Sequence, residues 1–116
     1  MATIRITDLS LRAVIGTNDW ERIHKQDVVI NIILTYDSQK ASKSDQIKDA
    51  VDYKTITKKI IKEVEGSEYQ LLEKLADSVL KIAMENPKVL SALVRIDKPL
   101  ALRFARSVSV EVSEER

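Results

Sequence analysis

The spacing of apolar residues changes twice along this chain, and this change constrains the fold more than any single motif. Strand-like patterns occupy two N-terminal segments, 3–14 and 27–36, and two C-terminal segments, 88–98 and 104–112. Alternation of apolar and polar residues is typical of strands with one buried face. In the first segment the alternation shifts near Thr7–Asp8, which indicates a break or bulge.

Between these segments the apolar spacing becomes helical. A first helix is expected from Tyr53, with apolar residues through Val64 and an end at Gly66. A second helix has an apolar stripe over 72–83, and Asn86–Pro87 closes it. Residues 67–70, Ser-Glu-Tyr-Gln, fit a capping box that opens it. The order ββααββ therefore predicts an α+β fold, with two helices on one face of a four-stranded antiparallel sheet.

The other face of this sheet mixes Ser, Asn, Thr and Arg with aliphatic residues. A half-polar face with long strand edges usually needs a partner. We therefore expect the chain to form oligomers by extending its sheet.

Length and charge exclude several classes of protein. With 116 residues the chain is expected to be one domain, 1–116, and its net charge of +1 does not call for nucleic acid or an anionic membrane. The absence of Cys excludes disulfides and cysteine nucleophiles, and it fits the reducing cytoplasm that we expect as the location. No apolar run approaches the ~20 residues of a membrane helix, and the N-terminus has no signal-peptide pattern.

The residues available for catalysis are few. His24 is the single histidine and is expected to be an exposed loop residue, so no metal site is predicted. Lys98 follows Ile96 at the end of a strand that reads as buried. It is either a surface lysine whose stem lies along apolar residues or an acid/base group tuned by burial.

Three further residues have simple structural explanations when each is taken singly. A carboxylate such as Glu73, early in the second helix, is favoured by the helix dipole. Tyr53 starts the first helix, and Glu21 lies in a polar segment, 17–26, where a solvated loop charge is the ordinary interpretation. Residue types alone leave these alternatives open.

Four segments together resemble the dihydroneopterin aldolase family, in the right order from Ile4 to Val112. They are IGTNDWERIHKQDVVINI, DAVDYKTITKKI, SEYQLLEKLADSVL and VRIDKPLALRFARSVSVEV. DYKTITK, LLEKL and IDKPLALRFARSVSV look most like the family's dihydroneopterin triphosphate 2′-epimerases, whereas DWE and KASKSD look more like its aldolases. Lys98-Pro99-Leu100-Ala101 departs from the Lys-Pro-Gly-Ala segment common in aldolases, which favours the epimerase.

The resemblance implies a tunnelling fold (T-fold), in which four subunits close a barrel ring and two rings stack into a homo-octamer with sites between subunits. It implies a small-molecule pterin substrate and a reaction without metal or cofactor. The activity would be epimerisation at C2′, or alternatively aldolase cleavage to 6-hydroxymethyl-7,8-dihydropterin and glycolaldehyde. A non-catalytic module of the same fold that binds pterins or purines is a further alternative.

The resemblance also assigns roles to individual residues. Lys98, Tyr53 and Glu21 would be catalytic. The substrate would be held by Glu73, Leu72, Val51 and Arg103. Glu73 would bind the pterin ring and the backbone of Leu72 would assist, while Val51 and Tyr53 would come from a neighbouring subunit. Arg103 is a candidate partner for a triphosphate, and so is Arg106.

Overall fold

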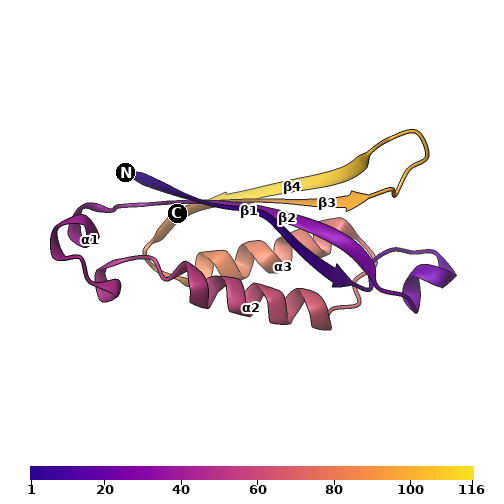
Figure 1. Ribbon diagram of the computed structural model, residues 1–116, viewed down its shortest axis with the longest axis horizontal. Coiled ribbons are helices and arrows are strands. Elements are labelled where there is room, and N and C mark those ends of the chain that lie inside the picture. The colour runs from indigo at the N-terminus through magenta and orange to yellow at the C-terminus, as the bar shows by residue number, and fades with distance from the viewer.

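The computed structural model describes residues 1–116 and has two layers, a sheet and a pair of helices (Figure 1). The strands are β1 (Ala2–Ala13), β2 (Gln26–Tyr36), β3 (Val89–Pro99) and β4 (Ser107–Glu115). They form one antiparallel sheet in the order β1-β2-β3-β4. The helices α2 (Tyr53–Gly66) and α3 (Leu72–Glu85) pack on one face of it. This confirms the predicted ββααββ architecture.

The core lies between the sheet and these two helices. On β2, Val28, Ile30, Ile32 and Leu34 are fully buried, as the alternation in the sequence predicts. The helices supply the facing layer. Its buried side chains are Ile56, Ile60, Val64, Leu75, Ala76, Val79, Leu80, Ala83 and Met84.

The predicted irregularity in β1 is a shift of register between Ile6 and Leu9. Asp8 takes a left-handed φ of 55°, and its backbone N–H donates to Oδ1 of Asn31 at 2.9 Å. The extra residue keeps Ile6 opposite Ile32 and Leu9 opposite Ile30, so both sides of the break still face the helices.

Two predictions about segment ends are wrong. The Ser67 hydroxyl donates to the carbonyl of Val64 at 2.7 Å and so closes α2, while α3 begins at Leu72 without a side-chain cap. The fourth strand begins at Ser107 and not at 104, because left-handed Leu100 and Phe104 form a turn across 100–106.

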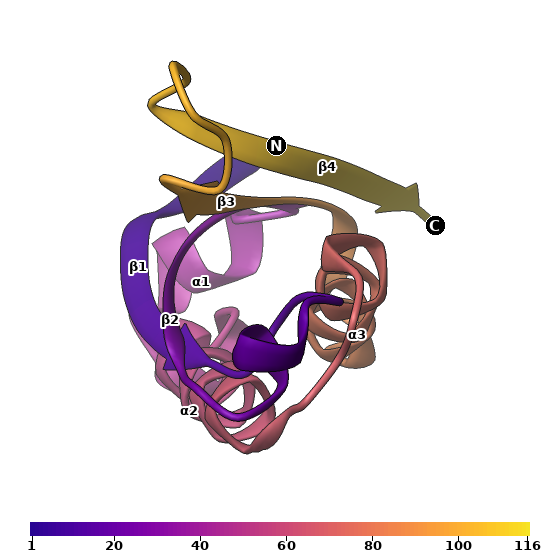
Figure 2. The same ribbon diagram turned by 90° about the vertical axis from the view of Figure 1, so that its right-hand side faces the viewer.

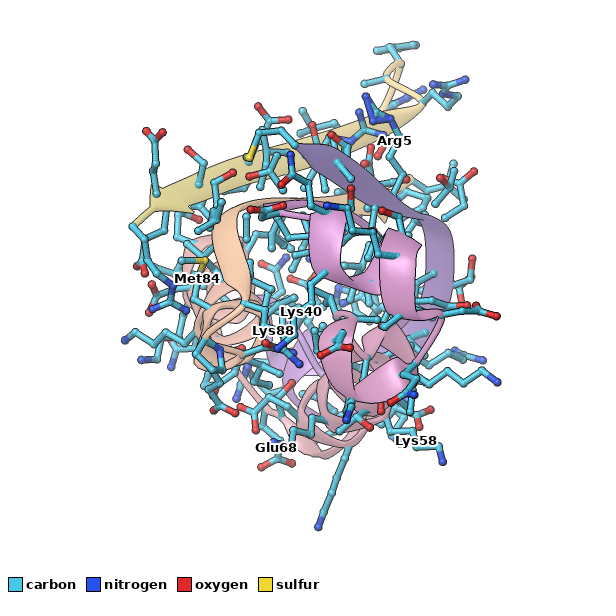
Figure 3. The ribbon with its side chains drawn as sticks, turned by 90° about the vertical axis from the view of Figure 1, so that its left-hand side faces the viewer. Arg5, Lys40, Lys58, Glu68, Met84 and Lys88 are labelled. Carbon is cyan, nitrogen blue, oxygen red and sulfur yellow. The ribbon has the colours of Figure 1, made fainter.

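The connection from β2 to α2 contains α1 (Gln39–Ser44) and a single 3₁₀ turn, η2 (Ile47–Asp49). Lys40 and Lys88 both contact η2, and the two side chains lie close to each other in Figure 3. Lys40 pairs with Asp49 at 3.4 Å, and Lys88 donates to the carbonyls of Lys48 and Ala50. These contacts fix the segment that leads into Tyr53.

A second 3₁₀ turn, η1 (Asp19–Arg22), lies in the connection from β1 to β2. Figure 2 views the molecule from this end, with η1 in dark purple in front of the helix layer. No helix of the structure has both the length and the apolar character needed to span a membrane.

Candidate functional site

Lys98 and Glu21 form an ion pair at the end of the molecule where β3 stops. Lys98 follows the buried residues Val94 and Ile96 at every second position, so its side chain points to the helix side of the sheet. Its ammonium donates a hydrogen bond to Oε2 of Glu21. The side chains are only 12% and 6% exposed, so the pair is largely withdrawn from solvent.

The Glu21 carboxylate has four hydrogen-bond donors. Oε1 accepts from the backbone N–H of Asn18 at 3.2 Å and from its side-chain amide at 2.8 Å. Oε2 accepts from Nε2 of Gln26 at 2.9 Å and from Lys98. The bond from Lys98 is the main reason that the pKa of Glu21 falls to about 2, with Gln26 and Asn18 acting in the same direction against burial. Glu21 is therefore ionised at neutral pH.

Gly16 leaves the space that this carboxylate occupies. Its φ is +124°, which few residues other than glycine adopt. A Cβ atom at this position would lie 2.3 Å from Cδ of Glu21. The glycine therefore permits both the turn after β1 and the placement of Glu21. The interpretation of Glu21 as a solvated loop charge is wrong, since the residue is 5% exposed.

Glu73 lies near the same end, in the first turn of α3, where its side chain is exposed. Leu72, at the start of α3, is partly buried. The segment before α3 is held against η1, because Arg22 donates to the carbonyls of Glu68 and Tyr69. Three predicted site residues, Glu21, Lys98 and Glu73, thus lie at the same end of the folded molecule.

Tyr53 and Val51 lie at the other end. Tyr53 begins α2, whose axis runs away from this point toward the Glu21 end (Figure 1), in a molecule 52 Å long. Its side chain is half exposed, whereas the side chain of Val51 is buried in the core and leaves only backbone atoms for a ligand. A single chain therefore does not bring these two residues to Lys98.

Arg103 and Arg106 belong to the turn between β3 and β4, which projects beyond the sheet (Figure 2). Both arginines are exposed, and the guanidinium of Arg103 lies 5.0 Å from the ring centre of Phe104. This ring is 96% exposed, which is unusual for phenylalanine.

The main hollows on the surface of one chain do not include the ion pair. Five hollows of about 390 to 730 Å³ lie on the surface, and none of these five is lined by Glu21, Lys98 or Glu73. The structure also has no cluster of three His, Asp or Glu residues suited to a metal ion, and His24 is exposed as predicted.

Asn18 and Gln26 position Glu21, and neither was predicted from the sequence. For Asn18, the sequence does contain one pattern that predicts the contact. Asn18 and Glu21 have the Asn-x-x-Glu spacing that commonly opens a helical turn, so a local contact between them could have been predicted. Gln26 has no comparable signal, because its contact with Glu21 depends on how the β1–β2 connection folds back.

The comparisons with known proteins agree with this fold. The chain is 46% identical over 116 residues to a dihydroneopterin triphosphate 2′-epimerase of Pseudomonas aeruginosa, covering all of this chain and 94% of the relative. It is 48% identical to the Escherichia coli protein of the same name, covering 99% and 96% of the two chains. The crystal structure of E. coli dihydroneopterin aldolase in complex with neopterin superposes with a TM-score of 0.93 at 30% identity, covering 98% and 99%.

The family model described as FolB, dihydroneopterin aldolase, matches residues 4–113. This range includes all four strands except their outermost residues, both long helices and the Glu21–Lys98 pair. The chain therefore belongs to the dihydroneopterin aldolase family.

Proposed function

We propose that the protein epimerises 7,8-dihydroneopterin triphosphate at C2′, through a retro-aldol step followed by an aldol step. Two relatives at 46% and 48% identity, which the chain matches over nearly its full length, carry the name of this activity. The observation that carries the proposal is the withdrawn ion pair of Glu21 and Lys98. A solvent-shielded lysine held by a carboxylate that is ionised at neutral pH is a positioned proton carrier.

The substrate supplies its own electron sink, the C6=N5 imine of the dihydropterin ring. Lys98 starts as the ammonium and gives a proton to N5. The resulting amine takes the proton of the 2′-hydroxyl. The electron pair of that O–H bond forms the C2′ carbonyl, and the pair of the C1′–C2′ bond moves into the ring to give an enamine.

Epimerisation reverses these steps after the aldehyde has turned. C1′ adds to the other face of the carbonyl, the oxygen at C2′ regains its proton from Lys98, and N5 returns its proton to Lys98. Substrate and product have the same atoms and differ only in configuration at C2′. Glu21 keeps its charge throughout, because its pKa of about 2 leaves it ionised.

The remaining residues bind and orient the substrate in this proposal. The Glu73 carboxylate accepts from the ring amino group and N3–H, a two-point contact suited to a planar edge. The backbone of Leu72 assists this contact. Arg103 pairs with the triphosphate, and Arg106 is a second candidate. Tyr53 is the third catalytic residue of this proposal, beside Lys98 and Glu21. It comes, with the backbone of Val51, from a neighbouring subunit in a homo-octamer of two stacked tetrameric rings.

The exposed apolar side chains at the Glu21 end support a covering subunit. Trp20 and Ile23 on one side are 55% and 76% exposed, and Leu100, Leu102 and Phe104 on the other are 59% to 96% exposed. Large exposed apolar side chains of this kind are typical of an interface. A single domain over residues 1–116, a cytoplasmic location and the absence of nucleic-acid partners stay predictions.

Aldolase activity is the second candidate, because the same bond is cleaved in both reactions and the E. coli aldolase has the same fold. The outcomes differ in whether the enamine is protonated at C1′ and the aldehyde leaves. Epimerase is preferred because the two epimerases match at higher identity than this aldolase.

A paired product assay tests the proposal. Purified protein is incubated separately with 7,8-dihydroneopterin and with its triphosphate, and the products are resolved by chromatography. Epimerised triphosphate with little free aldehyde is the expected result. Rapid release of 6-hydroxymethyl-7,8-dihydropterin and glycolaldehyde from the free pterin would identify an aldolase. Binding without turnover of either compound would identify a non-catalytic module.

A further inference from the structure

Arg22 links the connection between β1 and β2 to the segment that precedes α3. It directly follows Glu21 in η1, yet its guanidinium makes none of the ion pairs in the structure. All its side-chain hydrogen bonds go to backbone carbonyls. Nη1 donates to Gly16 at 3.0 Å and to Tyr69 at 3.1 Å, and Nη2 donates to Glu68 at 2.5 Å.

These three carbonyls belong to the two segments that carry the site. Gly16 packs against the Glu21 carboxylate, so its position and that of Glu21 depend on each other. Glu68 and Tyr69 lie three to four residues before Leu72, where α3 begins. Arg22 therefore spans from the turn that holds the proton-carrying pair to the segment that leads to Glu73.

The segment before α3 is also bonded to the helix layer, through the side chain of Tyr69. The hydroxyl of Tyr69 donates to Glu63 on α2 at 2.7 Å, and the ammonium of Lys74 lies 5.9 Å from the centre of the Tyr69 ring. Residue 69 is thus bonded through its side chain to the helix layer and through its carbonyl to Arg22. Movement of η1 relative to the start of α3 would break the bonds from Arg22 to Glu68 and Tyr69.

We propose that Arg22 is a positioning residue that fixes the spacing between the Glu21–Lys98 pair and Glu73, and so keeps the cleaved aldehyde in place for re-addition. The inference rests on the proposed function. Cleavage begins from an intact substrate whose own bonds hold the reacting atoms in place. Re-formation of the bond requires the enamine and the aldehyde to stay correctly placed relative to each other. It is therefore more sensitive than cleavage to a loss of rigidity in the site. The planar fork of Arg22 reaches three carbonyls from two nitrogens, whereas the three donors of a lysine lie on a single nitrogen and cannot match this geometry.

The test compares Arg22→Gln and Arg22→Lys with the wild type and with Arg12→Gln. Arg12 is a matched control, because it is exposed on the same hairpin and donates to one carbonyl, that of Lys25, at 2.9 Å. The ratio of released aldehyde to epimerised product is measured with 7,8-dihydroneopterin triphosphate. Both Arg22 variants should raise this ratio about tenfold, while Arg12→Gln leaves it unchanged.

Several results would overturn the assignment. An unchanged ratio in both Arg22 variants, even with a lower rate, would show that Arg22 only supports the fold. A wild-type ratio in Arg22→Lys would show that the charge matters and the fork does not. If the wild type turns over neither pterin, the proposed function fails and hydrogen exchange decides on the positioning role. Amides of residues 68–72 should then exchange faster in Arg22→Gln than in Arg12→Gln, and equal rates would refute it.

Discussion

The ammonium of Lys98 donates to the carboxylate of Glu21 across 77 positions of sequence. This contact joins the end of β3 to the turn between β1 and β2, and it gives Lys98 a partner that the apolar residues around it in the sequence do not suggest. A carboxylate that is 5% exposed is stable there only because four donors satisfy it. Stability and proposed activity therefore depend on the same group.

Acid should destabilise the protein through Glu21. The pKa of Glu21 is lowered from 4.5 to about 2 in the folded chain, so its contribution to stability is complete above pH 4.5 and is lost as the pH falls toward 2. A shift of this size corresponds to about 3 kcal/mol. Urea unfolding at several pH values should show this loss in the wild type and a much flatter profile in Glu21→Gln over the same range. Parallel profiles would contradict the assignment.

Gly16→Ala should destabilise the protein and displace Glu21. The new Cβ would overlap the carboxylate, and φ of +124° is strained for alanine. The expected loss is about 1–3 kcal/mol, accompanied by loss of turnover. Gly66→Ala is the control, because nothing lies within 4 Å of its Cβ position at the end of α2. It should leave turnover unchanged and stabilise the chain by about 0.4–1 kcal/mol. Equal unfolding midpoints of the two variants would refute this account.

Replacing Lys98 alone should destabilise the protein more than replacing both Lys98 and Glu21. Lys98→Met leaves a buried carboxylate without its main partner and should cost about 3 kcal/mol. The double variant Lys98→Met, Glu21→Gln should recover most of that stability, since no buried charge is left. Neither variant should turn over substrate, although binding of neopterin should stay measurable by calorimetry. Turnover in the double variant would show that Lys98 is not the proton carrier.

Tyr53→Phe and Lys98→Ala should complement each other if sites form between subunits. Tyr53 and Lys98 lie at opposite ends of the folded subunit, so they can act in one site only across a subunit interface. In an oligomer made of one variant, every site lacks one of the two residues and should be inactive. After joint unfolding and refolding, about one quarter of the sites in randomly mixed oligomers would contain both intact residues. Activity near that fraction of the wild-type value is expected. A mixture with no more activity than the separate variants would place both residues in the same subunit's site, or exclude Tyr53.

Arg103→Ala should distinguish the two pterin substrates. Arg103 is exposed and its guanidinium lies over the ring of its neighbour Phe104, so stability should be unaffected. Loss of its charge should raise KM for the triphosphate and leave turnover of 7,8-dihydroneopterin unchanged. Steady-state kinetics with both compounds checks this. Equal effects on both would remove Arg103 from phosphate binding, and Arg106→Ala would then be tested in the same way.

Sequence patterns predict the order of the strands and long helices, the bulge after Ile6 and the buried face of β2. These features are local, since the apolar period along a segment decides which face it buries. Sequence patterns were less successful at the ends of these segments, where side-chain hydrogen bonds and the local backbone conformation decide the boundary. The hydroxyl of Ser67 bonds to the last turn of α2 instead of capping α3. The left-handed residues Leu100 and Phe104 form a turn, so β4 begins later than predicted.

The geometry of the site arises only in the folded chain and could not be predicted from the sequence. Nothing near Glu21 in the sequence shows that it is buried, because its burial depends on the space at Gly16 and on donors at 18, 26 and 98. Likewise, the separation of Tyr53 from Lys98 follows from the direction in which α2 runs. Contacts between distant segments have no sequence period, so they emerge only when the sheet and helices pack together.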